Sequence, residues 1–242
     1  MQNPICISTG CVYELSDDRN DLIEKIRQFS PMGIMGIELS FAYPEYLLNF
    51  DIDNNNLEYL QGLEFNSIHA PRENITYGEN KTSKEVLQKV SELYKQINAR
   101  NVVFHEEQIE DYNSIISNNF VSSIENDDWK KPRHNVEDIK SILDKNKKLK
   151  FTLDFAHALS VSSSDIAEYI NYFKDKLIEI HLSVVDKDLE KHDFLHKYDS
   201  SEIRNLLQPL KTVFVPVILE AAVSNLEEMK FIKKEMEYIK NL

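Results

Sequence analysis

The amino-acid sequence predicts an α/β fold, a single (β/α)8 TIM barrel that spans residues 1–242 as one domain. Three observations predict it. The length suits such a barrel, because these domains commonly run to about 250 residues. Short apolar runs alternate with longer amphipathic patterns from one end of the chain to the other, which is typical of parallel β/α units. Histidine, aspartate or glutamate ends most of the apolar runs, the place where a barrel builds its active site.

The apolar runs number eight, the count that a closed barrel requires. The candidate strands are residues 5–8, 36–41, 66–69, 101–105, 122–125, 150–154, 178–181 and 214–220. An open, doubly wound sheet would alternate in the same way, but it often carries a glycine-rich phosphate loop after its first strand. Residues 8–11 read Ser-Thr-Gly-Cys and lack that repeat.

Amphipathic helices separate these strands. The clearest is expected over residues 83–99, with a capping box formed by Thr82 and Glu85. Its apolar stripe consists of Val86, Leu87, Val90, Leu93, Tyr94 and Ile97. A similar pair, Ser224 and Glu227, is expected to open the last helix, so the chain should end with a helix docked on the barrel.

Composition excludes several classes of protein. A net charge of -13 argues against nonspecific binding of nucleic acid, which relies on clustered Lys and Arg. Cys6 and Cys11 are the only cysteines and indicate no disulfide framework. The sequence has no secretory leader pattern and no run of about 18 apolar residues. We therefore expect a cytoplasmic protein that does not span a membrane; its oligomeric state is left open.

Titratable residues close seven successive candidate strands. Taken singly, a histidine or aspartate at a strand end more often caps a helix than binds a metal. In a closed barrel, however, these ends converge on one mouth, where several carboxylates repel one another unless cations or protons neutralise them. Imidazole mixed with carboxylate suits Zn or Mn, and also Fe or Co, better than Ca or Mg. The residues are Glu38, His69, His105, Glu125, Asp154 with His157, His181 and Glu220.

Five short strings carry a resemblance to a known superfamily. They are HAP at 69–71, IEN at 124–126, D-x-x-H-A at 154–158, HL at 181–182 and ILE at 218–220. In this order they resemble the xylose isomerase-like TIM barrels, which unite sugar and sugar-phosphate isomerases and epimerases with apurinic endonucleases of the endonuclease IV type. The resemblance covers nearly the whole chain.

The resemblance implies a metal centre of one to three ions. The superfamily's shared four-ligand core matches Glu125, Asp154, His181 and Glu220. The endonuclease IV branch adds ligands for a trinuclear zinc centre, and these positions match His69, His105, His157 and His192. Its remaining ligand is an aspartate, where this chain has Glu190; Asp186, Asp188 and Asp193 are rival carboxylates nearby.

Two chemistries suit such a mouth, and the sequence narrowly favours the first. In an isomerase or epimerase, the resemblance implies that one metal holds a sugar or sugar phosphate while Glu125 and Glu220 exchange protons through a metal-stabilised enediolate. His157 would then position a substrate oxygen. Lys187 is expected to hold the substrate's polar end, or to be an ordinary solvated lysine.

The alternative is a multinuclear phosphodiester hydrolase in which Glu125 bridges two ions. Arg72 would then meet a phosphate bidentately or, as an ordinary surface residue, pair with Glu73 or Glu106. The DNA-repair branch typically has an aromatic residue at this position, so nucleic acid is disfavoured as a partner. Glu38 is expected either to contact substrate or to hold a ligand histidine. A non-catalytic metal-binding barrel is a third interpretation.

Overall fold

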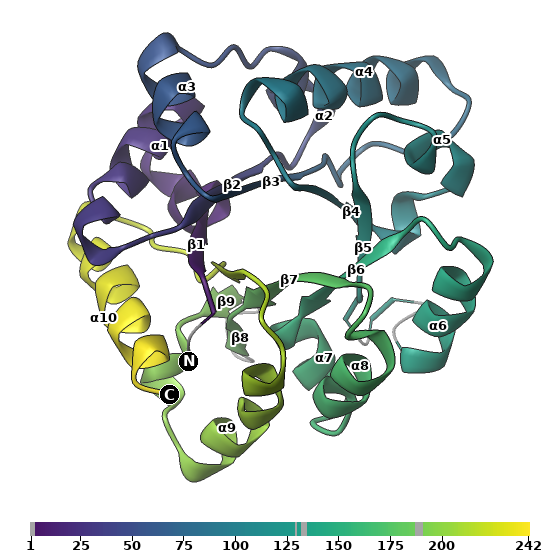
Figure 1. The fold of residues 1–242 in the computed structure, drawn as a ribbon. Coiled ribbons are helices and arrows are strands. Elements are labelled where there is room, and N and C mark those ends of the chain that lie inside the picture. Colours follow the sequence, from purple (N-terminus) through teal and green to yellow (C-terminus); the bar gives the residue numbers. More distant parts are fainter. Residues whose placement is uncertain (1–2, 129, 132–134, 187–190) are drawn as a thin grey trace.

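The computed structural model describes residues 3–128, 130–131, 135–186 and 191–242, and its centre is a closed parallel barrel (Figure 1). Around the barrel the strands run in the order β1-β10-β7-β6-β5-β4-β3-β2. The fold class predicted from the sequence is therefore confirmed. The strands are β1 (Ile5–Ser8), β2 (Gly36–Ser40), β3 (Phe65–His69), β4 (Asn101–His105), β5 (Ser122–Glu125), β6 (Lys150–Asp154), β7 (Leu177–Leu182) and β10 (Val217–Leu219).

The last barrel strand is shorter than the sequence predicted. Residues 214–220 were expected to form it, but only Val217–Leu219 pair with β1 and β7. Pro216 has no amide hydrogen to donate to a neighbouring strand, although its carbonyl oxygen accepts from the Ile180 amide at 3.0 Å. Phe214 is 74% exposed and lies outside the ladder.

Helices surround the barrel on its outside (Figure 1). In α4 the predicted apolar stripe packs inward, with Val86, Val90 and Leu93 buried. Each helix covers its strands because one face is apolar and the other is solvated. The α-helices are α1 (Arg19–Arg27), α2 (Pro44–Leu48), α3 (Asn54–Gln61), α4 (Lys81–Gln96), α5 (Tyr112–Ile116), α6 (Val136–Lys145), α7 (Phe155–Val161), α8 (Asp165–Phe173), α9 (Ser201–Leu206) and α10 (Met229–Lys240).

The two predicted capping boxes are wrong in their residues. Helix α4 begins two residues earlier than expected, because the Asn80 side chain accepts from the Ser83 amide at 2.8 Å and so caps the helix. It ends before Asn98, whose φ of 53° is left-handed. Near α10 the cap is Asn225, which accepts from the Glu228 amide, one residue beyond the predicted pair. A short 3-10 turn, η6 (Leu226–Glu228), precedes that helix.

Close packing fixes the barrel beneath the site. Gly36 begins β2, and a Cβ atom there would lie 1.5 Å from the Phe65 carbonyl oxygen, so only glycine fits. Cys6 and Cys11 are both buried and free, as expected from the absence of a disulfide framework. Among the described residues, no helix has the length and apolar character needed to cross a membrane.

The connections after the strands carry short elements above the mouth. Strand β1 runs into η1 (Thr9–Leu15), and β4 runs into η3 (Glu106–Gln108). After β7 the chain forms an antiparallel pair, β8 (Val184–Asp186) and β9 (Lys191–Asp193), in which Val185 lies opposite His192. Further 3-10 turns are η2 (Ser30–Met32), η4 (Leu195–Tyr198) and η5 (Gln208–Thr212).

Candidate metal centre

Successive parallel strands deliver the candidate ligands to one end of the barrel. Strand pairing sets His105 beside Glu125 and Asp154 beside His181, because each pair is in register across neighbouring strands. His69 ends β3, and Glu220 directly follows β10. All of these side chains therefore project from the carboxyl ends of the strands, where a TIM barrel holds its active site.

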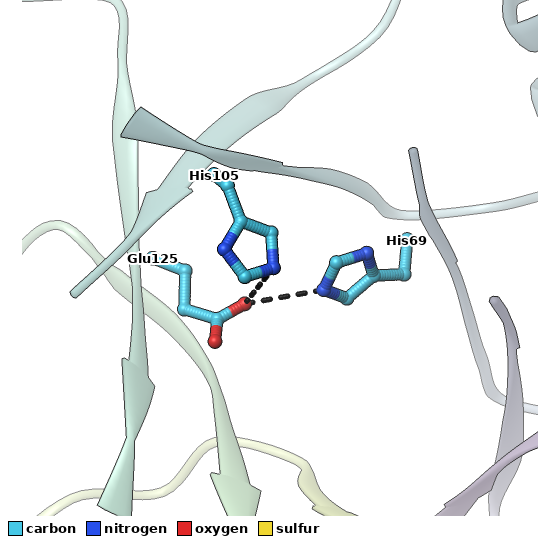
Figure 2. A group of neighbouring side chains, drawn as sticks. All are labelled: His69, His105 and Glu125. Carbon is cyan, nitrogen blue, oxygen red and sulfur yellow. Dashed lines mark hydrogen bonds and ion pairs between the residues drawn. The ribbon is translucent and has the colours of Figure 1, made fainter. Parts of the chain in front are cut away.

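Glu125 is the centre of the cluster. Its Oε2 atom lies 3.2 Å from His69 Nε2 and 3.8 Å from His105 Nε2, and Figure 2 shows both rings turned toward that oxygen. Its Oε1 atom lies 3.2 Å from His157 Nδ1. Glu125 is 2% exposed, so its charge is met by imidazoles and not by water.

His181 connects Glu125 to the other core ligands. Its Nδ1 atom lies 3.1 Å from Glu220 Oε1 and 3.5 Å from Glu125 Oε2. His181 and Asp154 are fully buried, and Glu125, Asp154 and His181 each offer an atom within 4.8 Å of the others. The four residues implied to form the shared core are therefore brought together.

A third group lies on the side of α7 and β9. Asp154, His157 and His192 also offer ligand atoms within 4.8 Å of one another. The Asp154 Oδ1 atom accepts from the His157 amide at 2.6 Å and so opens α7 as its N-cap. His192 Nδ1 lies 2.7 Å from the Ser183 hydroxyl, which holds that ring toward the mouth.

The donor atoms of these groups fit divalent transition ions. Three buried atoms, both ring nitrogens of His181 and the Oδ2 atom of Asp154, have no well-directed hydrogen bond to any described residue, although carboxylates lie close to the histidine. Buried polar atoms normally have a hydrogen-bond partner, so Asp154 Oδ2 and the His181 Nδ1 atom that faces Glu125 and Glu220 are suited to hold a ligand. Imidazole and carboxylate together are the donors that Zn and Mn accept.

The two glutamates of the core have lowered pKa values. Burial alone raises the pKa of Glu125, but the surrounding histidines outweigh it, His105 first, and hold the pKa well below its usual range. Burial acts in the same direction on Glu220, whose pKa falls to about 2 because His181 lies beside it. Both carboxylates are therefore ionised at neutral pH and available to bind cations.

The neighbouring groups carry the protons instead. Burial raises the pKa of Asp154 well above its usual range, and the charges of Glu125 and Glu220 add to the effect. Burial lowers the pKa of His157, yet Asp154 and Glu125 overcome it and raise the pKa to about 10. Asp154 raises the His157 pKa only while it is itself ionised, so the two groups share a proton that a bound metal would have to displace.

Known proteins resemble this chain in structure but not closely in sequence. No protein-family model matches it, and the search of curated proteins found no match. A D-tagatose 3-epimerase-like protein superposes with a TM-score of 0.63 at 17% identity, covering 98% of each chain. Endonuclease IV from Thermus thermophilus gives 0.65 at 15% identity, covering 99% of this chain and 100% of that one. An IolI protein with a bound zinc atom gives 0.64 at 15% identity, covering 98% and 95%.

The chain has the same TIM-barrel fold as these three proteins. This likeness covers the barrel from end to end, as the sequence resemblance implied. At these sequence identities the structural likeness shows the fold alone, so the reaction has to be inferred from the residues at the mouth of the barrel.

Below the mouth of the barrel, Glu38 lies against His181. Its Oε2 atom is 3.2 Å from His181 Nε2 and accepts from the Ser67 hydroxyl at 3.3 Å. Glu38 is fully buried, a position from which it can hold the imidazole so that Nδ1 faces the centre. Of its two predicted roles, the geometry favours holding a histidine over contacting substrate.

Arg72 lies at the rim of the same mouth. It lines a cavity together with His105 and His157, and its guanidinium has no carboxylate within 4.0 Å among the described residues. The alternative pairing with Glu73 or Glu106 is therefore absent from this part of the structure. An arginine without an anionic partner beside a candidate metal centre is suited to an anionic ligand.

Two predicted residues, Lys187 and Glu190, lie outside the described residues, as does the rival carboxylate Asp188. Another rival, Asp193, is engaged elsewhere, because Lys197 Nζ lies 2.7 Å from its Oδ1 and the Tyr198 hydroxyl donates to its Oδ2.

Sequence reasoning missed two buried carboxylates, Asp127 and Glu179. Asp127 is 2% exposed, and its Oδ1 atom lies 3.4 Å from His105 Nδ1. Glu179 is fully buried inside the barrel, where its Oε1 atom accepts from Asn101 at 2.8 Å, and burial raises its pKa. One signal was available for Glu179: it lies two residues before His181 on the same strand, so both side chains point to the same face.

Proposed function

We propose that this chain is a divalent-metal-dependent hydrolase of a small phosphoester, built around a centre of more than one ion. The observation that carries the proposal is the convergence of His69 and His105 on the carboxylate of Glu125 (Figure 2). A single-ion isomerase needs only the four core ligands, which leaves these two imidazoles without a task. The sequence alone narrowly favoured isomerisation, and this geometry supports the alternative.

The ligand groups share members, as a multinuclear centre requires. Glu125 belongs both to the group with His69 and His105 and to the group with Asp154 and His181. Asp154 belongs in turn to the group with His157 and His192. When bound, divalent ions of this kind lower the pKa of a coordinated water and stabilise charge on phosphoryl oxygens. Zn and Mn suit the donors best.

The protein's own residues would bind and orient the ester. Arg72 at the rim would donate two hydrogen bonds to phosphoryl oxygens, which fixes the phosphorus relative to Glu125. Hydrolysis then forms a bond from water oxygen to phosphorus and breaks the ester bond, and a proton passes to the departing alcohol. The glutamates are already ionised, so they need no deprotonation before they act.

The acidity of the chain supports a small substrate over nucleic acid. The net charge is -13, and the cavity beside the centre is bordered by Glu73, Glu107 and Asp128. A duplex would bring many phosphates against these carboxylates without the basic surface that stabilises such contacts.

A second candidate is the isomerase or epimerase, and one observation favours it. Glu220 and Glu125 both approach His181, from strands on different sides of β7, as a pair of proton-exchanging carboxylates would. Under this reading, one ion and a sugar or sugar phosphate occupy the mouth.

Metal content and turnover distinguish the phosphoester hydrolase from the isomerase or epimerase. We would load the purified protein with Zn or Mn and count ions by elemental analysis and anomalous scattering. Turnover would be assayed on bis-p-nitrophenyl phosphate, an abasic oligonucleotide and a panel of ketoses and aldoses. Variants His69→Ala and His105→Ala would be compared with His196→Ala, whose imidazole pairs with Glu235 away from the centre.

The proposal expects two or three ions, loss of one ion in His69→Ala and His105→Ala, and at least about a hundredfold slower phosphoester hydrolysis in these variants. The control should keep both metal and activity. One ion that survives both substitutions, together with sugar isomerisation, would establish the second candidate instead. An empty site after reconstitution would refute both.

A further inference from the structure

A cavity of about 120 Å³ opens beside the candidate centre. His105 and His157 form its inner wall, so anything bound there lies next to the cluster around Glu125. Arg72 and Lys131 contribute cationic groups on its border, and Lys131 pairs with Glu107 at 2.6 Å. Arg72 has no such carboxylate partner among the described residues, so it is the cation that is available to an anion.

Asp127 gives this cavity its second distinctive feature. Its Oδ1 atom faces His105 Nδ1 at 3.4 Å, whereas the other ring nitrogen, Nε2, is the one that approaches Glu125 in Figure 2. Asp127 is only 2% exposed, and its buried Oδ2 atom has no hydrogen-bond partner among the residues that the structure describes. A buried carboxylate oxygen without a donor is costly, unless a ligand supplies that donor.

A second residue of the cavity wall, Gln108, also has a buried acceptor oxygen without a hydrogen-bond donor among the described residues. Gln108 lines the cavity, and its amide nitrogen donates to Glu107 Oε1 at 2.7 Å. Its Oε1 atom is buried and has no partner within the described part of the chain. The two unpartnered oxygens require donors, whereas Arg72 requires an acceptor. Hydroxyl groups attached near a phosphate or similar anion satisfy both needs at once.

We infer that this cavity is a hydroxyl-binding subsite in which Asp127 accepts a hydrogen bond from a substrate hydroxyl while Arg72 holds the neighbouring anionic group. Asp127 is thus a specificity-determining residue that selects polyol or sugar esters over esters of simple alcohols. The inference rests on the proposed function, because the anionic group is taken to be the phosphoryl group held at the centre. It adds a substrate contact from the segment after β5.

The competing explanation is that Asp127 only positions His105. In that case removing the carboxylate would disturb the metal centre and weaken all anionic ligands equally. Binding of a substrate hydroxyl by Asp127 and positioning of His105 by Asp127 therefore make different predictions. Only hydroxyl binding changes the ratio between the affinity for an anion that carries hydroxyl groups and the affinity for one that lacks them.

The test uses two phosphonates that differ only in hydroxyl groups, 2,3-dihydroxypropylphosphonate and propylphosphonate. Their carbon–phosphorus bonds resist hydrolysis, so calorimetric titration of the metal-loaded protein measures binding without turnover. Asp127→Ala and Asp127→Asn would be compared with Asp128→Ala, which removes a neighbouring carboxylate on the same cavity. Arg72→Met completes the set, and metal content is measured for each protein.

The wild type should bind 2,3-dihydroxypropylphosphonate at least about tenfold more tightly than propylphosphonate, because a hydrogen bond to a charged acceptor contributes about that much to affinity. Both Asp127 variants should reduce that preference to about twofold, and Asp127→Asn should keep the metal because its amide oxygen still faces His105. Asp128→Ala should leave the preference intact. Arg72→Met should weaken both ligands by a similar factor.

No preference in the wild type, or an equal effect of the Asp127 and Asp128 substitutions, would overturn the inference. So would a parallel loss of metal and of both affinities in Asp127→Asn. Failure of the proposed function is separate, because it would appear as absent hydrolysis while the phosphonate preference persists.

Discussion

Metal binding should raise the thermal stability of this protein, and Glu125→Gln should remove most of the gain. A free ion at a thousand times its dissociation constant stabilises the folded state by about 4 kcal/mol per site. In a chain of about this size, each kcal/mol shifts the melting temperature by roughly 2–4 °C. One filled site should therefore raise it by about 8–16 °C.

The size of the loss follows from the number of ligand groups that each residue joins. Glu125 belongs to two of the groups, whereas His69 belongs to one. Glu125→Gln should therefore lose more of the metal-induced shift than His69→Ala, and His196→Ala should lose none. Each variant is compared with its own metal-free melt, so that changes in the folding of the metal-free protein cancel.

The assay is thermal unfolding followed by circular dichroism, with Zn or Mn present and again after chelation. A wild-type shift below about 2 °C would refute the metal centre, since it would correspond to less than about 1 kcal/mol. Equal shifts in wild type and Glu125→Gln would refute the central place given to that carboxylate. A larger loss in His69→Ala than in Glu125→Gln would contradict the sharing of ligands.

Three further predictions concern protons and folding. The pKa of His157 is raised to about 10 and that of His181 is also raised, so a bound metal must displace their protons. The apparent Zn affinity measured by competition with a chelator should therefore rise about tenfold per pH unit for each displaced proton. An affinity that does not change with pH would contradict this prediction. Gly36→Ala should cost about 4 kcal/mol or more in urea unfolding, because its Cβ would meet the Phe65 carbonyl, and a loss under about 1 kcal/mol would be inconsistent with that contact. Glu235→Leu should cost about 2–4 kcal/mol in the same assay, since two backbone N–H groups of η4 lose their acceptor, whereas Glu235→Gln should cost less.

The barrel was predictable because its signals are local and repeated. Each apolar run is short, each intervening helix has a stripe, and the carboxyl end of a parallel strand faces the mouth whatever its neighbours are. Candidate ligands that end strands, such as His69 and Glu125, could therefore be named from the sequence as residues of one mouth. Pairing between adjacent strands then brings His105 beside Glu125 without any further information.

Other features depend on contacts that a single sequence does not display. Asn80 caps α4 in place of the predicted box because several polar residues precede that helix, and the local pattern does not rank them. Asp127 follows β5 among other acidic residues, so only its burial and its contact with His105 distinguish it from a solvated loop residue. The same limit applies to Arg72, whose lack of a carboxylate partner among the described residues is visible only in three dimensions.

Because the chain is acidic, the salt dependence of its activity should distinguish a small anionic substrate from nucleic acid. A protein of net charge -13 repels a small anion at long range, so under the proposed function Arg72 and the metal ions would have to provide the attraction at short range. Salt screens the long-range repulsion more than the buried contacts. For a small phosphoester, kcat/KM should therefore stay level or rise between about 20 and 200 mM salt, whereas nucleic-acid binding through several phosphates should weaken steeply over that range. If kcat/KM for bis-p-nitrophenyl phosphate fell steeply with salt, the attraction would not lie within the mouth. If only the binding of an oligonucleotide fell steeply, the protein would have a basic surface that its net charge does not reveal.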